Sequence, residues 1–347
     1  MREILAWLHH IFKGVMMDLK HAHLCCQWCG FEGPSDAFDL DSKNGDGFWC
    51  PDCDGHTYYE KSRNQTRRIF LILETKDSPP PSVKKNRTLQ KRLSPLRYPG
   101  GKSKLIDFLG THLRSSQLDS FTEAFAGGAS VGLSLLNAGL TKRLIINDTD
   151  PGVYSFWEQA VNDPGTILSL LDGPLPTRED FFEARKMLDE PNKWSRSDLA
   201  WSQLLVNRLS FSGISTACPL GGKNGDRDGL LSRWNPKELQ RRIRKIHSMS
   251  ASIDVTRERA EDLIEKSAYW DERSTLFVDP PYVAAGKRLY RQYFTEGDHK
   301  NLAWLLDSLF RGIPGADIII TYDDCPLIRS LYQNIAEIAT IGRQYSI

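Results

Sequence analysis

Short apolar runs alternate with helix-like spacing of apolar residues from about residue 96 to the end of the chain. Four of these runs predict strands, at residues 119–125, 143–147, 274–278 and 316–321. Helices are expected between them, and this alternation is typical of an α/β domain with a mostly parallel sheet. A mainly helical pattern at residues 164–246 predicts an insertion between the second and third strands.

Two segments of different composition precede this α/β region. Residues 20–72 are rich in Cys, Trp, Asp and Gly, which predicts a small separate module. Residues 73–95 contain three consecutive prolines and several basic residues, and such a stretch predicts a semi-rigid or disordered spacer. We therefore expect a module at 20–72, a basic Pro-rich linker at 73–95 and the α/β domain at 96–347.

The overall composition is that of a soluble globular protein, with 40% apolar and 26% charged residues. Because the formal net charge is +1, binding of a polyanion requires local basic patches. No apolar run approaches the roughly 20 residues that span a bilayer, and residues 1–20 lack a signal-peptide cleavage site. We expect a cytoplasmic monomer without a membrane segment. Translation from Met16 or Met17 stays open.

Four cysteines in the first module form two CxxC pairs, Cys26 with Cys29 and Cys50 with Cys53. Each CxxC turn places two thiolates on one side of a metal, and Zn²⁺ prefers tetrahedral thiolate ligation. The pattern predicts a structural zinc ribbon, and four unrelated buried thiols are the alternative. The basic residues that follow the ribbon are compatible with DNA contact, with protein docking or with an ordinary solvated face.

Two glycine-rich turns are candidates for holding a ligand. Residues 123–130 lead from a strand into a helix, and their candidate binding residues are Phe125, Gly127, Gly128 and Ser130. Asp148 follows the next strand at the spacing at which a carboxylate reaches ribose hydroxyls in nucleotide-binding domains. The alternatives are a tight turn without a ligand and, for Asp148, an N-cap of the helix near Pro151.

The second glycine-rich turn comes earlier and contributes Tyr98, Gly100, Gly101 and Lys102. A lysine beside unhindered backbone is suited to an anionic group such as a carboxylate. An ordinary turn into the next helix is the alternative.

The most specific string is Asp279-Pro280-Pro281-Tyr282, at the end of a predicted strand. Prolines fix φ and lack an N–H, so their carbonyl groups are available to a ligand. The Asp279 carboxylate and a proline carbonyl suit the two hydrogens of an exocyclic amine, and holding both favours a tetrahedral nitrogen that can attack a methyl group. A base must leave its duplex stack to reach such a site, and Tyr282 offers it a stacking face.

The chain from about residue 96 onward resembles the Dam-like family of DNA adenine-N6 methyltransferases, including their phage-borne members. It carries RYPGGK, EAFAGGAS, IINDTD and DPPY in that order, with the family-like strings NRLSFSG, RWNP and GKRLY beside them. The resemblance implies a Rossmann-like fold, S-adenosylmethionine as cofactor and double-stranded DNA as partner. It also implies that Tyr98 and Lys102 contact the methionine end of the cofactor, that the turn at residues 125–130 wraps it and Asp148 holds its ribose, and that Asp279 lies between cofactor and adenine.

Two features depart from the resemblance. Arg259, flanked by Glu258 and Glu261, stands where relatives commonly carry an aspartate that meets the cofactor adenine. The chain also stops at Ile347, where relatives continue through a last strand, so we expect a shortened sheet with lower stability or activity. A DNA-binding protein that has lost turnover therefore remains an alternative. N4-cytosine methylation is another, although Asp rather than Ser before the prolines favours adenine.

The helical insertion is where a region that recognises the DNA target is expected. Its loop at residues 211–234 carries polar and basic residues suited to bases and phosphates, among them Gly221, Gly222, Lys223, Asn224, Arg227 and Arg233. A following helix adds Arg241, Arg242, Arg244 and Lys245, which are either phosphate contacts or a solvated helix face. A GATC target is implied only by the family.

Overall fold

The structure is a computed structural model that describes most of the chain from residue 68 to 342, and the backbone of short strands before it. Within 68–342 the residues not described are 77, 82, 84–85, 87–88, 91, 99, 223–224, 268–272, 284–292 and 313–314, as well as the side chains of 310–312. The short N-terminal strands are β1 His23–Cys26, β2 Glu32–Pro34, β3 Asp39–Leu40, β4 Phe48–Trp49 and β5 Tyr58–Glu60.

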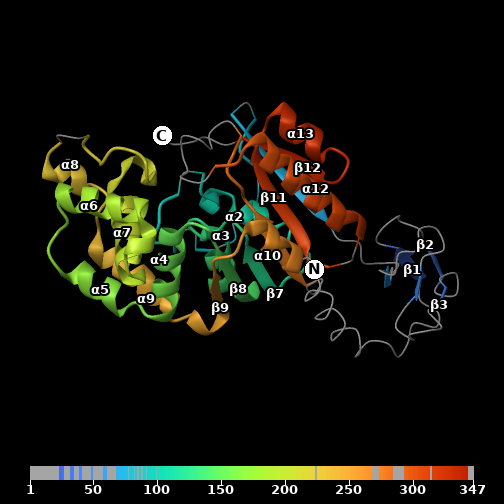
Figure 1. Cartoon of the computed structure of the whole chain (residues 1–347), viewed down its shortest axis with the longest axis horizontal. Helices are drawn as coiled ribbons and strands as arrows, with labels where there is room; N and C mark the ends of the chain where they lie inside the picture. Colours follow the sequence, from blue (N-terminus) through green and yellow to red (C-terminus); the bar gives the residue numbers. More distant parts are fainter. Residues whose placement is uncertain are drawn as a thin grey trace.

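A parallel sheet of seven strands forms the centre of the described region, in the order β12-β6-β11-β10-β7-β8-β9 (Figure 1). The strands are β6 Ile69–Thr75, β7 Leu118–Glu123, β8 Thr141–Asn147, β9 Ile253–Thr256, β10 Ser274–Val278, β11 Asp317–Asp323 and β12 Glu337–Gly342. The four predicted strands are confirmed as β7, β8, β10 and β11. Parallel strands that are buried on both faces are continuous apolar runs in the sequence, and these four strands could be predicted for that reason.

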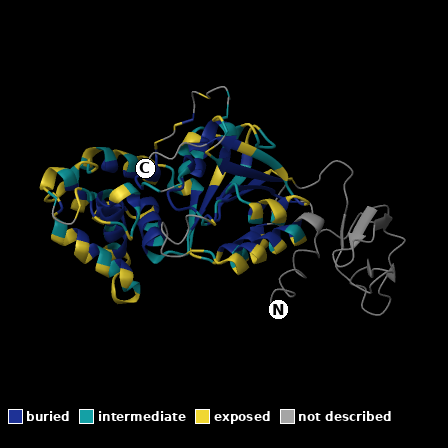
Figure 2. Cartoon of the chain, turned by 90° about the horizontal axis from the view of Figure 1, so that it is seen from above, coloured by how far each residue is buried: buried dark blue, intermediate teal, exposed yellow. Residues whose placement is uncertain are grey.

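Helices cover both faces of the sheet, and the buried residues fall into a separate core on each side. One core includes α2 Ile106–Gly110, α3 Ser130–Asn137 and α4 Pro151–Asn162 together with helices of the insertion, and the other includes α10 Ala260–Ser267, α12 Glu296–Gly312 and α13 Pro326–Tyr332. Figure 2 shows the buried sheet between helices whose outer faces are exposed. No described helix is both long and apolar enough to cross a bilayer.

The residues of the predicted insertion form helices that lie beside the sheet domain (Figure 1). Its helices are α5 Gly165–Asp172, α6 Arg178–Asp189, α7 Arg196–Leu209, α8 Arg227–Leu231 and α9 Pro236–His247. Short 3₁₀ turns complete the described elements: η3 Lys102–Lys104, η4 Pro191–Lys193, η5 Phe211–Gly213 and η6 Ser250–Ser252. Two of the long helices begin with capping boxes, Thr177 with Asp180 and Ser195 with Asp198, which satisfy the exposed N–H groups of their first turns.

The expected boundary between module and linker, at residues 72 and 73, is wrong because it falls inside β6. This strand is buried between β11 and β12, with Leu71, Ile72 and Leu73 fully enclosed. Leu89 and Leu93, also assigned to the linker, pack into the core of the sheet domain. The apolar run of β6 has the character of a buried parallel strand, but its flanking charges and the prolines after it suggested a spacer.

Candidate active site

The carboxyl ends of the central strands meet, as the sequence predicts, and a buried asparagine joins their loops. Asn147, at the end of β8, donates its side-chain N–H to the carbonyl oxygens of Ala124 (3.0 Å) and Glu258 (3.1 Å). Its side-chain oxygen accepts from the Glu258 N–H at 2.9 Å. This side chain therefore fixes the glycine turn after β7 relative to the loop after β9.

The glycine turn at residues 124–130 lies directly against the earlier turn that contains Tyr98. Gly127 has φ +46°, and a Cβ there would lie 2.8 Å from the Tyr98 ring, so only glycine fits. The Gly127 N–H donates to Asp148 Oδ2 at 2.9 Å, and its carbonyl accepts from Trp157 Nε1 at 2.9 Å. The two glycine-rich turns thus lie against each other.

Asp148 organises the backbone at this site. Its carboxylate accepts N–H groups of Gly127 and, at 3.0 Å, of Asp150. The alternative that Asp148 caps the following helix is wrong, because Asp150 accepts the N–H groups of Gly152 and Val153 at the start of α4. Burial, with a smaller effect of the Asp150 charge, raises the pKa of Asp148 to about 7.

A pocket of about 190 Å³ opens beside Asp148. Its lining residues are Ala124, Phe125, Asp148, Thr149, Arg259, Ala260, Glu261 and Phe294. The rings of Phe125 and Phe294 meet edge to face, with centroids 5.6 Å apart. Phe294 was not predicted, because it lies far along the chain from the other lining segments and only the fold brings it there.

Arg259, the departure from the family pattern, lines this same pocket. Its side chain is mostly exposed and lies 3.8 Å from a carboxylate oxygen of Glu261. Glu261 also lines the pocket, so an acidic group is present two residues beyond the position where an aspartate was expected.

Asp279 follows β10 and is held by a buried lysine from the earlier glycine-rich turn. Lys102 Nζ lies 2.5 Å from both carboxylate oxygens of Asp279 and donates to the Gly100 carbonyl at 2.9 Å. The Thr321 hydroxyl, from β11, donates to Asp279 Oδ1 at 2.6 Å. The Lys102 side chain is 2% exposed and that of Asp279 is 19% exposed, so the carboxylate forms the accessible part of the pair.

A second carboxylate approaches the same lysine from β6. Glu74 Oε1 lies 3.7 Å from Lys102 Nζ, and its side chain is fully buried. Burial raises the pKa of Asp279 above its ordinary value, and the Glu74 charge adds to this effect; Lys102 and Thr321 oppose it. The sequence analysis did not identify Glu74, because it placed this residue in the linker predicted to begin at residue 73.

The remaining residues of the Asp-Pro-Pro-Tyr string are more enclosed than Asp279. Pro280 is buried, Pro281 is partly buried, and Tyr282 is 7% exposed. The Tyr282 ring packs between the Lys102 ammonium, 4.9 Å from its centroid, and the Tyr322 ring, 6.3 Å away. In this arrangement the ring is not an open stacking surface.

Glu123 is a further buried acid that the sequence reasoning treated only as part of a turn. Its side chain accepts the Gly132 N–H at 2.6 Å, at the start of α3. Burial raises the pKa of Glu123 to about 8, with a smaller contribution from the Asp279 charge. Glu123 therefore belongs to the electrostatic surroundings of Asp279.

The zinc prediction falls largely on residues that the structure does not describe. Cys26 ends the β1 backbone, and Cys29, Cys50 and Cys53 lie outside the described residues, as do residues 1–20. Among the side chains that are described, no group of three or more His, Cys, Asp or Glu is arranged to hold a metal. The zinc ribbon stays a prediction.

Comparison with known proteins gives two matches. The model of the D12 class N6 adenine-specific DNA methyltransferases matches residues 98–347. The retron Ec67 DNA adenine methylase of Escherichia coli is 23% identical over 248 residues, which cover 69% of this chain and 80% of that protein.

Proposed function

Because the chain belongs to the D12 class N6 adenine-specific DNA methyltransferase family, we propose that Asp279 is the centre of its methyl transfer to the N6 amino group of adenine. The observation that carries this assignment is the position of the Asp279 carboxylate. It is the accessible end of a buried charge cluster at a strand end, beside the two joined glycine turns. Ligands of parallel α/β sheets bind at such strand ends.

S-adenosylmethionine, the methyl donor that the family implies, supplies a methyl group bound to a positively charged sulfur. The pocket beside Asp148 fits its adenosine part. Phe125 and Phe294 provide aromatic walls for a purine, and the Asp148 carboxylate provides acceptors for ribose hydroxyls. Glu261 is an acceptor for an exocyclic amine in place of the expected aspartate. Tyr98 covers Gly127 and closes the site from the other side.

Asp279 and the Pro280 carbonyl accept the two hydrogens of the adenine amino group. For this to occur Lys102 must release at least one carboxylate oxygen, since it contacts both. Glu74 offers the ammonium a second carboxylate, and the carboxylate of the methyl donor offers a third. Bound S-adenosylmethionine would supply the methyl group, with its S–C bond exchanged for an N–C bond to the amine, and one amine proton would have to leave. The raised pKa of Asp279 suits it to take that proton.

The Asp279→Asn variant tests this assignment. Asparagine keeps the size of the side chain but cannot receive the proton and cannot accept through both oxygens, so methyl incorporation into duplex DNA should fall by at least about 100-fold. Asp254→Asn is the matched control, because Asp254 also pairs with a basic side chain, Arg143, but lies on β9. Near-normal incorporation by Asp279→Asn, with a folded protein, would exclude the assignment.

We also propose that Cys26, Cys29, Cys50 and Cys53 hold a structural Zn²⁺. The support is their CxxC spacing, which matches thiolate zinc sites. Purified protein should contain one zinc per chain by elemental analysis, and Cys29→Ser or Cys53→Ser should lower that content. Cys218→Ser removes an exposed cysteine and should leave it unchanged. Protein without zinc, or equal zinc in all variants, contradicts the proposal.

A further inference from the structure

Four arginines from separate segments gather where the helical insertion meets the sheet domain. Arg97 precedes η3, Arg208 lies near the end of α7, Arg233 follows α8, and Arg242 lies on α9. Arg208 is within electrostatic reach of the other three. Arg233 and Arg242 were candidates from the sequence, whereas Arg97 and Arg208 were not.

Hydrogen bonds from side chains to backbone groups join these segments. The Asn207 side chain accepts the Arg97 N–H and donates to the Arg97 carbonyl, both at 2.7 Å. Arg208, the next residue, donates from Nη2 to the Arg233 carbonyl at 2.6 Å. These hydrogen bonds of Arg97 and Arg208 involve amide and carbonyl groups and no acidic side chain.

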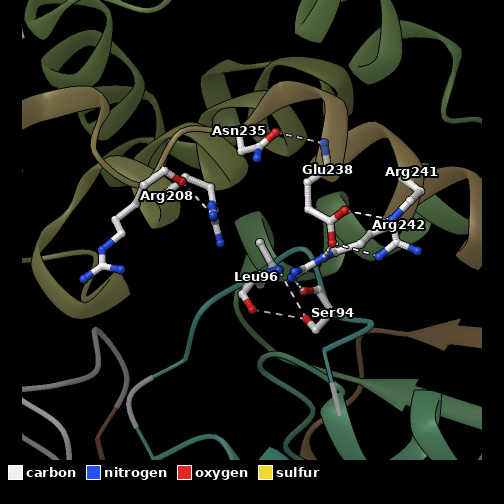
Figure 3. Close-up of polar contacts among 8 residues, drawn as sticks. Ser94, Leu96, Arg208, Asn235, Glu238, Arg241 and Arg242 are labelled. Carbon is white, nitrogen blue, oxygen red and sulfur yellow. Dashed lines mark hydrogen bonds and ion pairs between the residues drawn. The ribbon is translucent and has the colours of Figure 1, made fainter. Parts of the chain in front are cut away.

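Glu238, an acid whose charge acts on Arg208, already accepts hydrogen bonds from other arginines. Glu238 accepts from Arg241 and Arg242, each at 2.8 Å, and these hydrogen bonds lower its pKa to about 2 (Figure 3). Arg242 also donates to the Ser94 carbonyl at 2.8 Å, which ties α9 to the segment leading into the glycine turn. The Glu238 charge therefore offsets only part of the effect of burial and of the neighbouring positive charges on Arg208.

Two of the guanidinium groups keep unused donors. In the part of the chain that the structure describes, Arg97 Nη1 and Arg208 Nε are buried and meet no hydrogen-bond acceptor. Burial and the neighbouring positive charges lower the pKa of Arg97 and bring that of Arg208 to about 10. Holding like charges together in this way is unfavourable unless an anion joins them.

We propose that Arg97, Arg208 and Arg233 bind a backbone phosphate of the DNA strand that carries the target adenine, with Arg242 fixing the frame around them. This inference rests on the proposed function for its choice of ligand. Guanidinium groups match phosphate oxygens with paired hydrogen bonds. Arg97 is next to Tyr98, whose ring lies against Gly127 in the glycine turn at residues 124–130. A phosphate bound by Arg97 would therefore lie between the helical insertion and the candidate active site.

DNA binding without methyl donor tests the proposal separately from catalysis. Fluorescence anisotropy with a labelled duplex, measured at several salt concentrations, gives the dissociation constant and its salt dependence. Arg97→Gln and Arg208→Gln should each weaken binding to every duplex sequence alike. Each should also lower the slope of log affinity against log salt by up to about 0.9, the value for one phosphate that is no longer neutralised. Arg208→Gln removes a hydrogen bond to the Arg233 carbonyl and could destabilise the fold. Arg97 Nη1 has no hydrogen-bond partner in the described structure, so Arg97→Gln tests the same phosphate site if Arg208→Gln does not fold.

Arg143→Gln is the matched control, because it removes one exposed arginine paired with Asp254 on the outer strands. It should leave the slope nearly unchanged. An unchanged slope in both test variants overturns the proposal. A second contradicting result is that inorganic phosphate raises the melting temperature of wild type but not of the variants, while wild type and variants bind DNA with equal affinity. Lowered slopes without methyl transfer by wild type would sustain the phosphate site while the proposed function fails.

Discussion

At the scale of single residues, the chemistry depends on how one buried lysine is shared. Lys102 contacts both oxygens of Asp279 and lies 3.7 Å from Glu74, so two carboxylates compete for one ammonium. Asp279 and Lys102 were candidates from the sequence, because each stands in a distinctive short string. Glu74 was not, since nothing in its own neighbourhood indicates that β6 lies beside Asp279.

The pH dependence of methyl transfer should report this sharing. Asp279 must be ionised to accept the amine hydrogens, so activity is present above its pKa and is lost as pH falls through it. Because that pKa is raised, the loss should begin at higher pH than for an ordinary aspartate. Glu74→Gln removes a negative charge that raises the pKa of Asp279, so the midpoint should move to lower pH.

The measurement is the turnover rate from about pH 5 upward at saturating DNA and methyl donor. Asp107→Asn, which alters another buried acid that is not among the main causes of the Asp279 pKa shift, should leave the midpoint in place. A midpoint that stays or rises in Glu74→Gln contradicts the role given to Glu74. A merely structural effect would lower the rate without moving the midpoint.

At the scale of elements, the sheet was predictable except for β6. The strands β7, β8, β10 and β11 are apolar runs that end in chemically distinctive residues, so both their existence and their functional ends could be predicted. β6 is as apolar as these, but the pairing of parallel strands joins segments far apart in sequence and leaves no local signal. The sheet has seven strands in the described residues because β6 supplies one from before the family region.

Leu71→Ala tests whether β6 is an integral strand. Leu71 is fully buried between the neighbours β11 and β12, so the substitution leaves a cavity and should lower the free energy of unfolding by about 2–5 kcal/mol. Leu170→Ala, at a leucine that is 40% exposed, should cost much less. Equal effects of the two changes in denaturant unfolding would show that β6 does not belong to the core.

At the scale of the whole molecule, the proposed functional residues lie in the sheet domain and in the helical insertion. The sequence predicts those of the sheet domain better than those of the insertion. The motifs of the sheet domain indicate the chemistry, because amine methylation needs a particular set of groups at a strand end. The helical insertion was predicted as an element, but its arginines at the joint were only partly identified. Arg208 lies on a helix with no basic run around it, and its basic neighbours Arg97, Arg233 and Arg242 come from other segments that the fold brings to α7.

The most direct test of the account is the identity of the methylated base. DNA incubated with the protein and S-adenosylmethionine is digested to nucleosides and analysed by mass spectrometry. We expect N6-methyladenine with wild type and Asp254→Asn, and at least about 100-fold less of it with folded Asp279→Asn. N4-methylcytosine as the product, or N6-methyladenine made equally by Asp279→Asn, would contradict it.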